Sequence, residues 1–351
     1  MTIQKKTQDN IVKNRFKYCV EVAFVFFGIF LILFPISLII DLVEKTSIFY
    51  GPLLFVSKAL GLLVALPILL FLIQKILKWD TDIVKREHIT ASRSFLKLFR
   101  ITKSNFKYQL LYGFLFLFLI FIPLDFLIYL IPGVIDYSIE SLTFNKANAY
   151  LLYENYPFFL ISVLIIQISV AFYEESIARG FLAKRGNDYF KRMSAVIISS
   201  FYFGLAHFAY ILQPITFQYS ILFPIIWFLQ TFFVGIVLAL FTLRKLWLFP
   251  VFFAHACNNI ISAHTLWVWN QSYDFFTISL YIYFPLLFIG ILLFIWQFSR
   301  IKKGIKSGLN EFQNYFKNDD SISEEGNDKF TRIIIDFLIG GIIFVMAYFL
   351  I

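Results

Sequence analysis

A short group of charged residues interrupts a long apolar stretch of the chain. Glu174, Glu175 and Arg179 follow the apolar segment 157–170. A charged side chain at the centre of a bilayer costs about 2.5–3.5 kcal/mol even on the lower insertion scales, so these residues need partners, a wet cavity or a chemical role. On a helix, Arg179 lies one turn after Glu175 and can pair with it. Glu174 points about 100° away from Glu175 and therefore faces another group.

His207 and His255 also lie in apolar runs. His207 ends the sequence Phe-Gly-Leu-Ala-His, and His255 begins His-Ala-Cys-Asn-Asn. Ionisable residues inside membrane helices usually face the bundle interior or water, and they are functional-site hypotheses by default. His255 and Asn259 are four residues apart and share one helix face, whereas Asn258 is expected to turn away from them. His88 lies in a hydrophilic segment, and we assign it no role.

The composition places these residues in a membrane protein. Hydrophobic residues make up 60% of the chain and charged residues 15%, against roughly 45–50% and about 25% in soluble domains. The net charge of +9 is attributed to basic cytoplasmic loops rather than to nucleic-acid binding, because no basic face alternates with exposed aromatic residues. The two cysteines lie in or beside apolar runs, so neither a disulfide framework nor a cysteine-rich metal site is expected.

The predicted fold class is an all-α, polytopic transmembrane bundle of about nine spans. A span needs about 20 apolar residues, and nine stretches provide them: 19–43, 50–77, 108–134, 157–182, 193–212, 218–243, 245–268, 275–298 and 332–351. Loops rich in lysine and arginine alternate with loops that hold at most one such residue, which predicts a cytoplasmic N-terminus. The first run is too long for a signal peptide, so it is expected to remain as a helix.

Four regions follow from these spans. Residues 1–156 form an N-terminal membrane region of three helices with a cytoplasmic amphipathic segment at 75–107, and residues 157–298 form the helical core that carries the motifs. Residues 299–331 are expected to be a cytoplasmic polar linker, flexible near its acidic end, before a C-terminal helix at 332–351. Three further polar residues lie in spans: Gln230 and His264 are interpreted as structural or interface residues, and Asp125 is unexplained.

The motif residues can be placed at similar depths in the bilayer. With a rise of 1.5 Å per residue, Glu174, His207, His255 and Asn259 lie at overlapping heights along their helices. A carboxylate in a low-dielectric site is suited to act as a base for water, and one imidazole can hold that water. The second imidazole and the carboxamide can stabilise an oxyanion. This set predicts direct attack of water on a peptide bond, without a serine, cysteine or threonine nucleophile.

The order of the motifs carries a family resemblance. Glu-Glu-x-x-x-Arg at 174–179, Phe-x-x-x-His at 203–207 and His-x-x-x-Asn at 255–259, each in an apolar helix, resemble the CPBP family. These proteins are also called the ABI or type II CAAX proteases, and their best-known members are the Ras-converting CAAX prenyl endopeptidases. The similar region covers about residues 157–268 and includes the flanking runs 199–206 and 247–254.

The resemblance implies an intramembrane glutamate protease. By position, Glu174 would activate water together with His207, Glu175 and Arg179 would form a supporting pair, and His255 and Asn259 would stabilise the oxyanion. Two histidines and two glutamates are ligand types for Zn²⁺. No metal or cofactor is predicted, because the resemblance points to carboxylate-activated water and the His-Glu-x-x-His spacing is absent.

Each motif also has a simpler interpretation. The glutamates can be a solvated helix end, His207 a hydrogen-bonded core histidine, and His255 with Asn259 a link between helices; their joint occurrence favours an active site. A non-enzymatic bacteriocin-immunity or scaffold membrane protein is the main alternative. A proton-coupled transporter is the third, and it should show repeats and broken helices.

The expected substrate and location follow from composition as well as from the family. The Phe-, Ile- and Lys-rich composition is typical of an AT-rich bacterial genome, so we expect a multi-pass protein of the bacterial plasma membrane rather than the eukaryotic ER. The expected partners are the lipid bilayer and a peptide or membrane-anchored protein substrate. A prenylated CAAX substrate is not expected in a bacterium.

Overall fold

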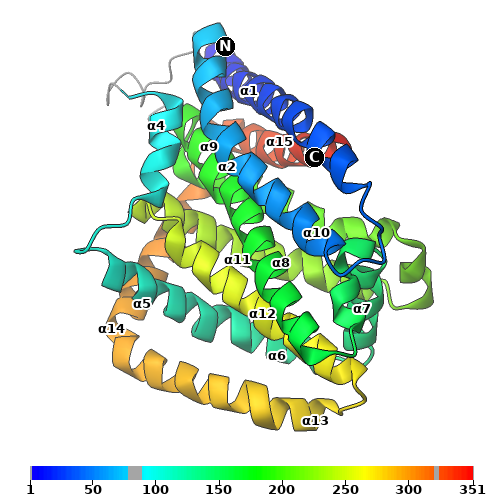
Figure 1. Ribbon diagram of the computed structural model, residues 1–351. Helices are drawn as coiled ribbons and strands as arrows, with labels where there is room; N and C mark the ends of the chain where they lie inside the picture. Colours follow the sequence, from blue (N-terminus) through cyan, green and yellow to red (C-terminus); the bar gives the residue numbers. More distant parts are fainter. Residues whose placement is uncertain (1, 78–88, 320–323, 351) are drawn as a thin grey trace.

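The described part of the chain, residues 2–77, 89–319 and 324–350 of a computed structural model, folds into helices and contains no strand (Figure 1). Long runs of Leu, Ile, Phe and Val explain this result. In lipid, each backbone amide must find its hydrogen-bond partner within its own segment, and a helix provides that partner. The predicted all-α class is therefore confirmed.

Eight helical rods in the described residues are long and apolar enough to cross a membrane. Four are single helices: α1 (Thr2–Ile40), α2 (Tyr50–Leu77), α11 (Leu222–Lys245) and α15 (Asp328–Leu350). Four are composite: α5 (Phe106–Phe116), η2 (Leu117–Phe121) and α6 (Ile122–Tyr129); α8 (Tyr156–Glu175), η4 (Ser176–Ala183) and α9 (Lys184–Tyr189); α10 (Arg192–Phe208) and η5 (Ala209–Leu212); and α13 (Phe275–Ile278), η7 (Ser279–Tyr283) and α14 (Phe284–Tyr315).

One of the nine expected spans, 245–268, corresponds to the helix α12 (Phe249–Asn270), which is not among those eight. Its 22 residues are sufficient to cross the membrane, but its polar residues, including His255 and Asn259, lower its mean hydropathy. α12 packs between α5 and α8 in the interior of the bundle. The expected span that is too polar to be counted among the eight is therefore the helix that carries His255 and Asn259.

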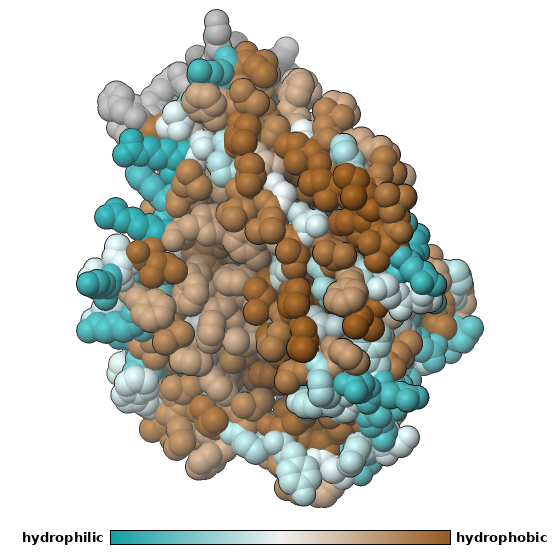
Figure 2. All heavy atoms as spheres, in the orientation of Figure 1, coloured by the Kyte–Doolittle hydropathy of each residue, from teal (hydrophilic) through white to brown (hydrophobic). Residues whose placement is uncertain are grey.

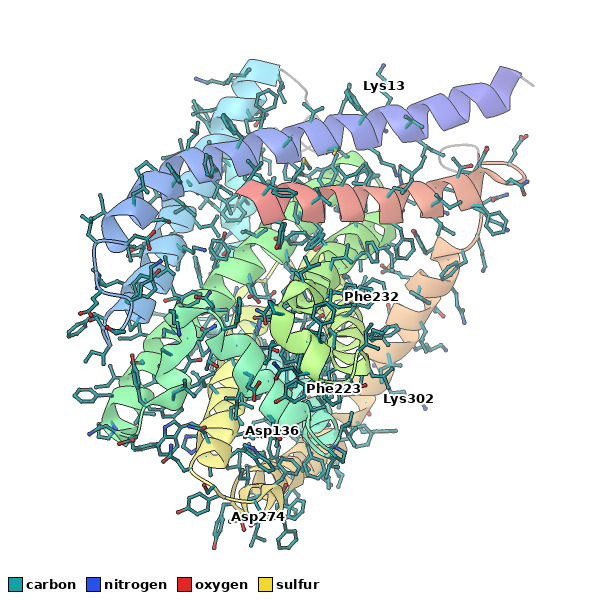
Figure 3. All side chains as sticks on the ribbon, turned by 90° about the vertical axis from the view of Figure 1, so that its right-hand side faces the viewer. Lys13, Asp136, Phe223, Phe232, Asp274 and Lys302 are labelled. Carbon is teal, nitrogen blue, oxygen red and sulfur yellow. The ribbon has the colours of Figure 1, made fainter. Side chains whose placement is uncertain are left out.

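Short elements connect the rods, and the two ends of the chain pack together on one side of the core. The connecting elements are α4 (Ala91–Leu96), η1 (Lys97–Phe99), α7 (Val134–Thr143), η3 (Lys146–Leu152) and η6 (Pro214–Gln218). α15 packs against α1 and α10, and Figure 3 shows α1 and α15 side by side. Apolar residues dominate the face drawn in Figure 2, with polar residues mainly at its margins, as expected for a surface in contact with lipid.

The structure does not show one long amphipathic helix in the described part of the segment 75–107. Residues 78–88 lie outside the described residues, and residues 89–107 contain only the six-residue α4 and the single turn η1 before α5 begins. Phe95 and Leu98 are buried in the bundle. Leu98 O also accepts a hydrogen bond of 2.9 Å from Leu248 N, directly before α12. Phe95 and Leu98 therefore pack into the core, while Leu96 and Ile101 of the same segment are exposed.

The polar segment 299–331 also needs a correction. α14 continues to Tyr315, so the first half of this segment is helical. The described part of its acidic end is packed: Glu324 is buried and accepts a hydrogen bond of 2.7 Å from Arg332 Nε. Asp336 in α15 is fully buried, where it accepts hydrogen bonds from Arg15 Nε at 2.7 Å and from the Tyr315 hydroxyl at 3.0 Å. Buried acids need such partners, and these attach α15 to α1 and α14.

The start of α2 gives the first testable prediction. A Cβ on Gly51 would lie 2.3 Å from the Ala147 carbonyl oxygen, whereas a Cβ on Gly304 would meet nothing within 4 Å. Gly51→Ala should therefore destabilise the protein by about 1–3 kcal/mol, as overpacking usually does. Gly304→Ala should be neutral or stabilise it by up to about 1 kcal/mol, because alanine favours helix. Thermal unfolding in nanodiscs compares the two, and equal midpoints would contradict the close packing of α2 on η3.

Candidate active site

Glu175, the last residue of α8, is the buried centre of a polar group. Its Oε1 atom accepts a hydrogen bond of 3.0 Å from Arg179 Nη1 and another of 2.8 Å from His255 Nδ1. Both Glu175 and Arg179 are fully buried. The ion pair expected from their spacing forms, and it also holds an imidazole that lies 80 positions later in the sequence. Because a carboxylate oxygen can only accept, the Nδ1 atom of His255 carries the proton in this hydrogen bond.

The backbone leaves α-helical geometry directly after Glu175. Residues 176–183 form the π-helical turn η4, a rare conformation that is frequent at functional sites. Ser199 of α10 donates a hydrogen bond of 2.6 Å to the Ala178 carbonyl in this turn. The guanidinium carbon of Arg179 lies 4.1 Å from the centre of the Phe203 ring, a cation–π contact. The turn is thus fixed against α10, which carries His207.

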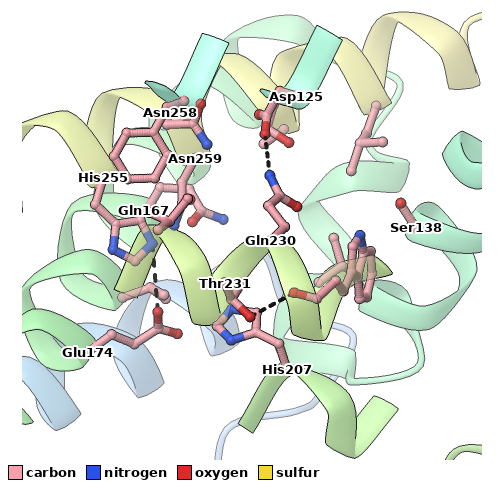
Figure 4. Close-up of a pocket in the computed structure, with 18 of the residues that line it drawn as sticks. Asp125, Ser138, Gln167, Glu174, His207, Gln230, Thr231, His255, Asn258 and Asn259 are labelled. Atoms are coloured by element: carbon pink, nitrogen blue, oxygen red, sulfur yellow. Dashed lines mark hydrogen bonds and ion pairs between the residues drawn. The ribbon is translucent and has the colours of Figure 1, made fainter. Parts of the chain in front are cut away.

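Glu174 differs from its neighbour because its side chain is 29% exposed, whereas that of Glu175 is fully buried. Glu174 Oε2 lies 3.7 Å from His255 Nε2 (Figure 4). His255 is therefore placed between two carboxylates, with Nδ1 on Glu175 and Nε2 toward Glu174. A ring nitrogen donates only when it carries a proton, so His255 can donate at both positions only when both of its nitrogens are protonated.

His207 differs from His255 because its Nδ1 atom is bonded within its own helix and its Nε2 atom is available as an acceptor. Its Nδ1 lies 3.0 Å from the Phe203 carbonyl oxygen in its own helix. Since a carbonyl only accepts, Nδ1 is the donor, and in the neutral ring Nε2 is left as an acceptor. The Phe203 ring packs edge-on against both imidazoles, at 4.7 Å from His207 and 6.1 Å from His255. Phe203 thus positions both rings relative to Arg179.

A single cavity of about 340 Å³ connects these groups. Glu174, Glu175, His207, His255 and Asn259 all line it, while Arg179 lies behind Glu175. The four candidate catalytic residues come from three helices, α8, α10 and α12, and Figure 4 shows their side chains around the cavity. The residues that the sequence singled out are therefore next to one space large enough for a few residues of a peptide.

The cavity also contains polar residues that the sequence analysis undervalued. Asp125 was left unexplained, Gln230 was interpreted as structural and Asn258 was expected to turn away, yet all three line the cavity. Asn258 lies three positions after His255, a spacing that also brings side chains to neighbouring places on a helix. That spacing was a usable signal for Asn258. The sequence gives no comparable local signal for Asp125, whose partners are on other helices.

His264 lies in an aromatic group, as expected for a structural residue. Its ring stacks on Trp267 at 6.1 Å and contacts the rings of Tyr156 and Phe159. Within the described ranges, no three His, Cys, Asp or Glu side chains are arranged so that they could share a metal ion. Glu175 and the Nδ1 atom of His255 are already bonded to each other.

The comparison with known families matches this region. Residues 156–261 match the family model described as Rce1-like, type II CAAX prenyl endopeptidase Rce1-like. This part of the chain is similar to a protease family. The matched segment covers less than a third of the chain and contains all six candidate site residues. The family resemblance predicted from the motifs is therefore confirmed. No curated protein and no solved structure matches the chain.

Proposed function

We propose that the protein is an intramembrane endopeptidase that hydrolyses a peptide bond of a membrane-associated peptide or protein. The observation that carries this proposal is the single cavity, within a membrane helix bundle, that receives Glu174, His207, His255 and Asn259. The same residues lie in the segment similar to type II CAAX prenyl endopeptidases.

Glu174 acts as the general base. It is the carboxylate with exposed surface in the cavity, whereas Glu175 is bonded to Arg179 and His255. His207 Nε2 accepts a hydrogen bond from the attacking water, and Glu174 removes the other proton as the oxygen attacks the carbonyl carbon. A proton moved between fixed groups in a water-poor site needs little solvent reorganisation.

His255 and Asn259 stabilise the oxyanion that forms. With Nδ1 held by Glu175, the Nε2 atom of His255 donates to the oxyanion when it carries a proton, and the Asn259 amide offers a second donor. The protonated Glu174 then gives its proton to the leaving nitrogen as the C–N bond breaks. The products are a new carboxyl terminus and a new amino terminus. The transfer to nitrogen returns Glu174 to its carboxylate form, and the new acid loses the remaining water proton on release.

The membrane setting limits the substrate to chains that reach the bilayer. The cavity lies among helices that are long enough to span the bilayer, so a membrane-anchored protein or an apolar peptide is the expected substrate class. We assign the protein to the bacterial plasma membrane with a cytoplasmic N-terminus, on the charge of its loops and its composition.

The test compares peptides from the membrane and medium of cells that contain the wild-type protein, Glu174→Gln, or no protein. We expect a set of new carboxyl termini with the wild type that is absent from the other two. Glu154→Gln is the matched control, because Glu154 is exposed in the loop before α8 and should behave as wild type. If Glu174→Gln matches the wild type while deletion differs, the protein acts without proteolysis, as a scaffold or immunity protein.

A further inference from the structure

Asp125 in α6, Gln230 in α11 and Asn258 in α12 form a second polar group in the cavity, which we call the acceptor cluster. In Figure 4, Asp125 and Gln230 lie across the cavity from Glu174. Asp125 is only 7% exposed, and its Oδ1 accepts a hydrogen bond of 3.2 Å from Gln230 Nε2. The mechanism proposed above uses none of these three residues.

Two buried oxygens of the acceptor cluster have no hydrogen-bond donor among the described residues. One is Asp125 Oδ2 and the other is Asn258 Oδ1. Asn258 is a neighbour of the carboxylate, but no hydrogen bond of ordinary geometry joins its amide to Asp125 Oδ2. Burying an acceptor without a donor costs about 1–3 kcal/mol, and more for a charged group. A ligand that supplies donors at this place would remove that cost.

The charge of the cavity indicates which donors are suitable. Three carboxylates line it, those of Asp125, Glu174 and Glu175, and no lysine or arginine of the described ranges lines it. Arg179 pairs with Glu175. No lysine or arginine of the described residues pairs with Asp125, whose Oδ1 accepts from the neutral amide of Gln230. A neutral donor would satisfy the oxygens but not the charge, whereas an ammonium or guanidinium group supplies both donors and charge.

We propose that the acceptor cluster is a substrate subsite that binds a cationic group of the peptide, either a basic side chain or a terminal amine. This inference rests on the proposed peptidase function. Asn258 is adjacent to Asn259 and one turn after His255 on α12, so the cation lies close to the carbonyl that is attacked. At about 3.3–3.6 Å per extended residue, it belongs to a residue within one or two positions of the cleaved bond.

Binding to the uncleaving Glu174→Gln protein in nanodiscs tests the subsite without any cleavage. The probes are N-acetyl-lysine methylamide and its uncharged analogue of similar length, N-acetyl-norleucine methylamide. The lysine compound should bind about ten- to a hundredfold more tightly, the discrimination expected of a charge-assisted hydrogen bond. N-acetyl-arginine methylamide and norleucine methylamide with a free amine distinguish a guanidinium and a terminal amine as the source of the charge.

The preference should depend on Asp125. In the Asp125→Asn protein, where the new amide can still accept from Gln230, the lysine and norleucine compounds should bind equally. Asn258→Leu, which removes the second acceptor at similar volume, should reduce the preference several-fold, and it provides a second variant if Asp125→Asn does not fold. Asp136→Asn, at an exposed position on α7, is the matched control and should keep the full preference. Equal binding in the parent protein, or a preference that survives Asp125→Asn, would overturn the proposal.

Cleavage separates the failure of this inference from the failure of the peptidase assignment. The carboxyl termini generated by the wild type should have lysine, arginine or a free amine within two residues of the cleaved bond. A lysine preference in binding together with no cleavage by the wild type would leave the cation site standing and reject the peptidase function. Cleavage together with equal binding of the two compounds would reject the subsite alone.

Discussion

Glutamine at position 174 should lower the rate of peptide cleavage by about 10²–10⁴-fold, the usual contribution of a general base. The replacement keeps the shape of the side chain and removes its ability to take a proton from water. Because Glu174 is partly exposed in the cavity and makes a contact of only 3.7 Å with His255, the fold should not depend on it. The measurement is the single-turnover rate on a substrate found by the carboxyl-terminal comparison, together with the thermal midpoint in nanodiscs.

Two comparisons make this result specific to position 174. Glu154→Gln, the exposed control, should retain the wild-type rate and midpoint. Glu174→Asp keeps the carboxylate but withdraws it by one methylene, and it should retain more activity than the glutamine variant while losing part of the rate. A Glu174→Gln protein that is folded and cleaves within a few-fold of the wild type would contradict the assigned base.

Local spacing predicts the parts of this site that lie on one helix. Glu175 and Arg179 are four residues apart and form the expected ion pair, and Glu174, about 100° round the helix, has exposed surface in the cavity instead. The spacing of His255 and Asn259 likewise places both on the cavity. In each case the side chains lie on one helix, so their spacing in the sequence determines their relative directions.

The spacing of residues along one helix does not predict which side chains of different helices come into contact. The hydrogen bond from His255 to Glu175 joins residues 80 positions apart, and that from Gln230 to Asp125 joins residues 105 apart. The π-helical turn after Glu175 was not predicted either, since the apolar pattern of 176–183 is compatible with an ordinary α-helix. Such features depend on how rods pack, which periodicity alone does not determine.

Charge patterns were misleading where buried partners were far away in the sequence. The acidic end of the segment 299–331 was expected to be flexible, and no partner was predicted for Asp336 in the last helix. Asp336 is instead bonded to Arg15, 321 positions earlier, and both are buried. A run of charged residues is solvated in most proteins. Here, the partner was in the first helix, and no local signal connects the two.

Removing the positive charge of Arg179 should produce the largest loss of stability in this site. In Arg179→Met, the fully buried Glu175 carboxylate loses its counter-ion and keeps only the hydrogen bond from His255. Leaving one partner of a buried ion pair uncompensated typically costs about 3–5 kcal/mol. Unfolding in mixed detergent micelles measures the change, and Arg179→Lys, which keeps the charge, should cost less.

The double variant Glu175→Gln with Arg179→Met tests whether charge is the cause. The neutral amide oxygen can still accept from His255, and no buried charge is left without a partner, so the double variant should be more stable than Arg179→Met alone. A coupling of about 0.5–3 kcal/mol is expected for groups in direct contact. The stability losses of the single variants Glu175→Gln and Arg179→Met are measured for comparison. If these two losses simply add in the double variant, or if each is below about 1 kcal/mol as for exposed pairs, then water solvates this pair. The fixed position of His255 would then lose its main support, because the hydrogen bond from its Nδ1 atom depends on a Glu175 carboxylate that is kept away from water.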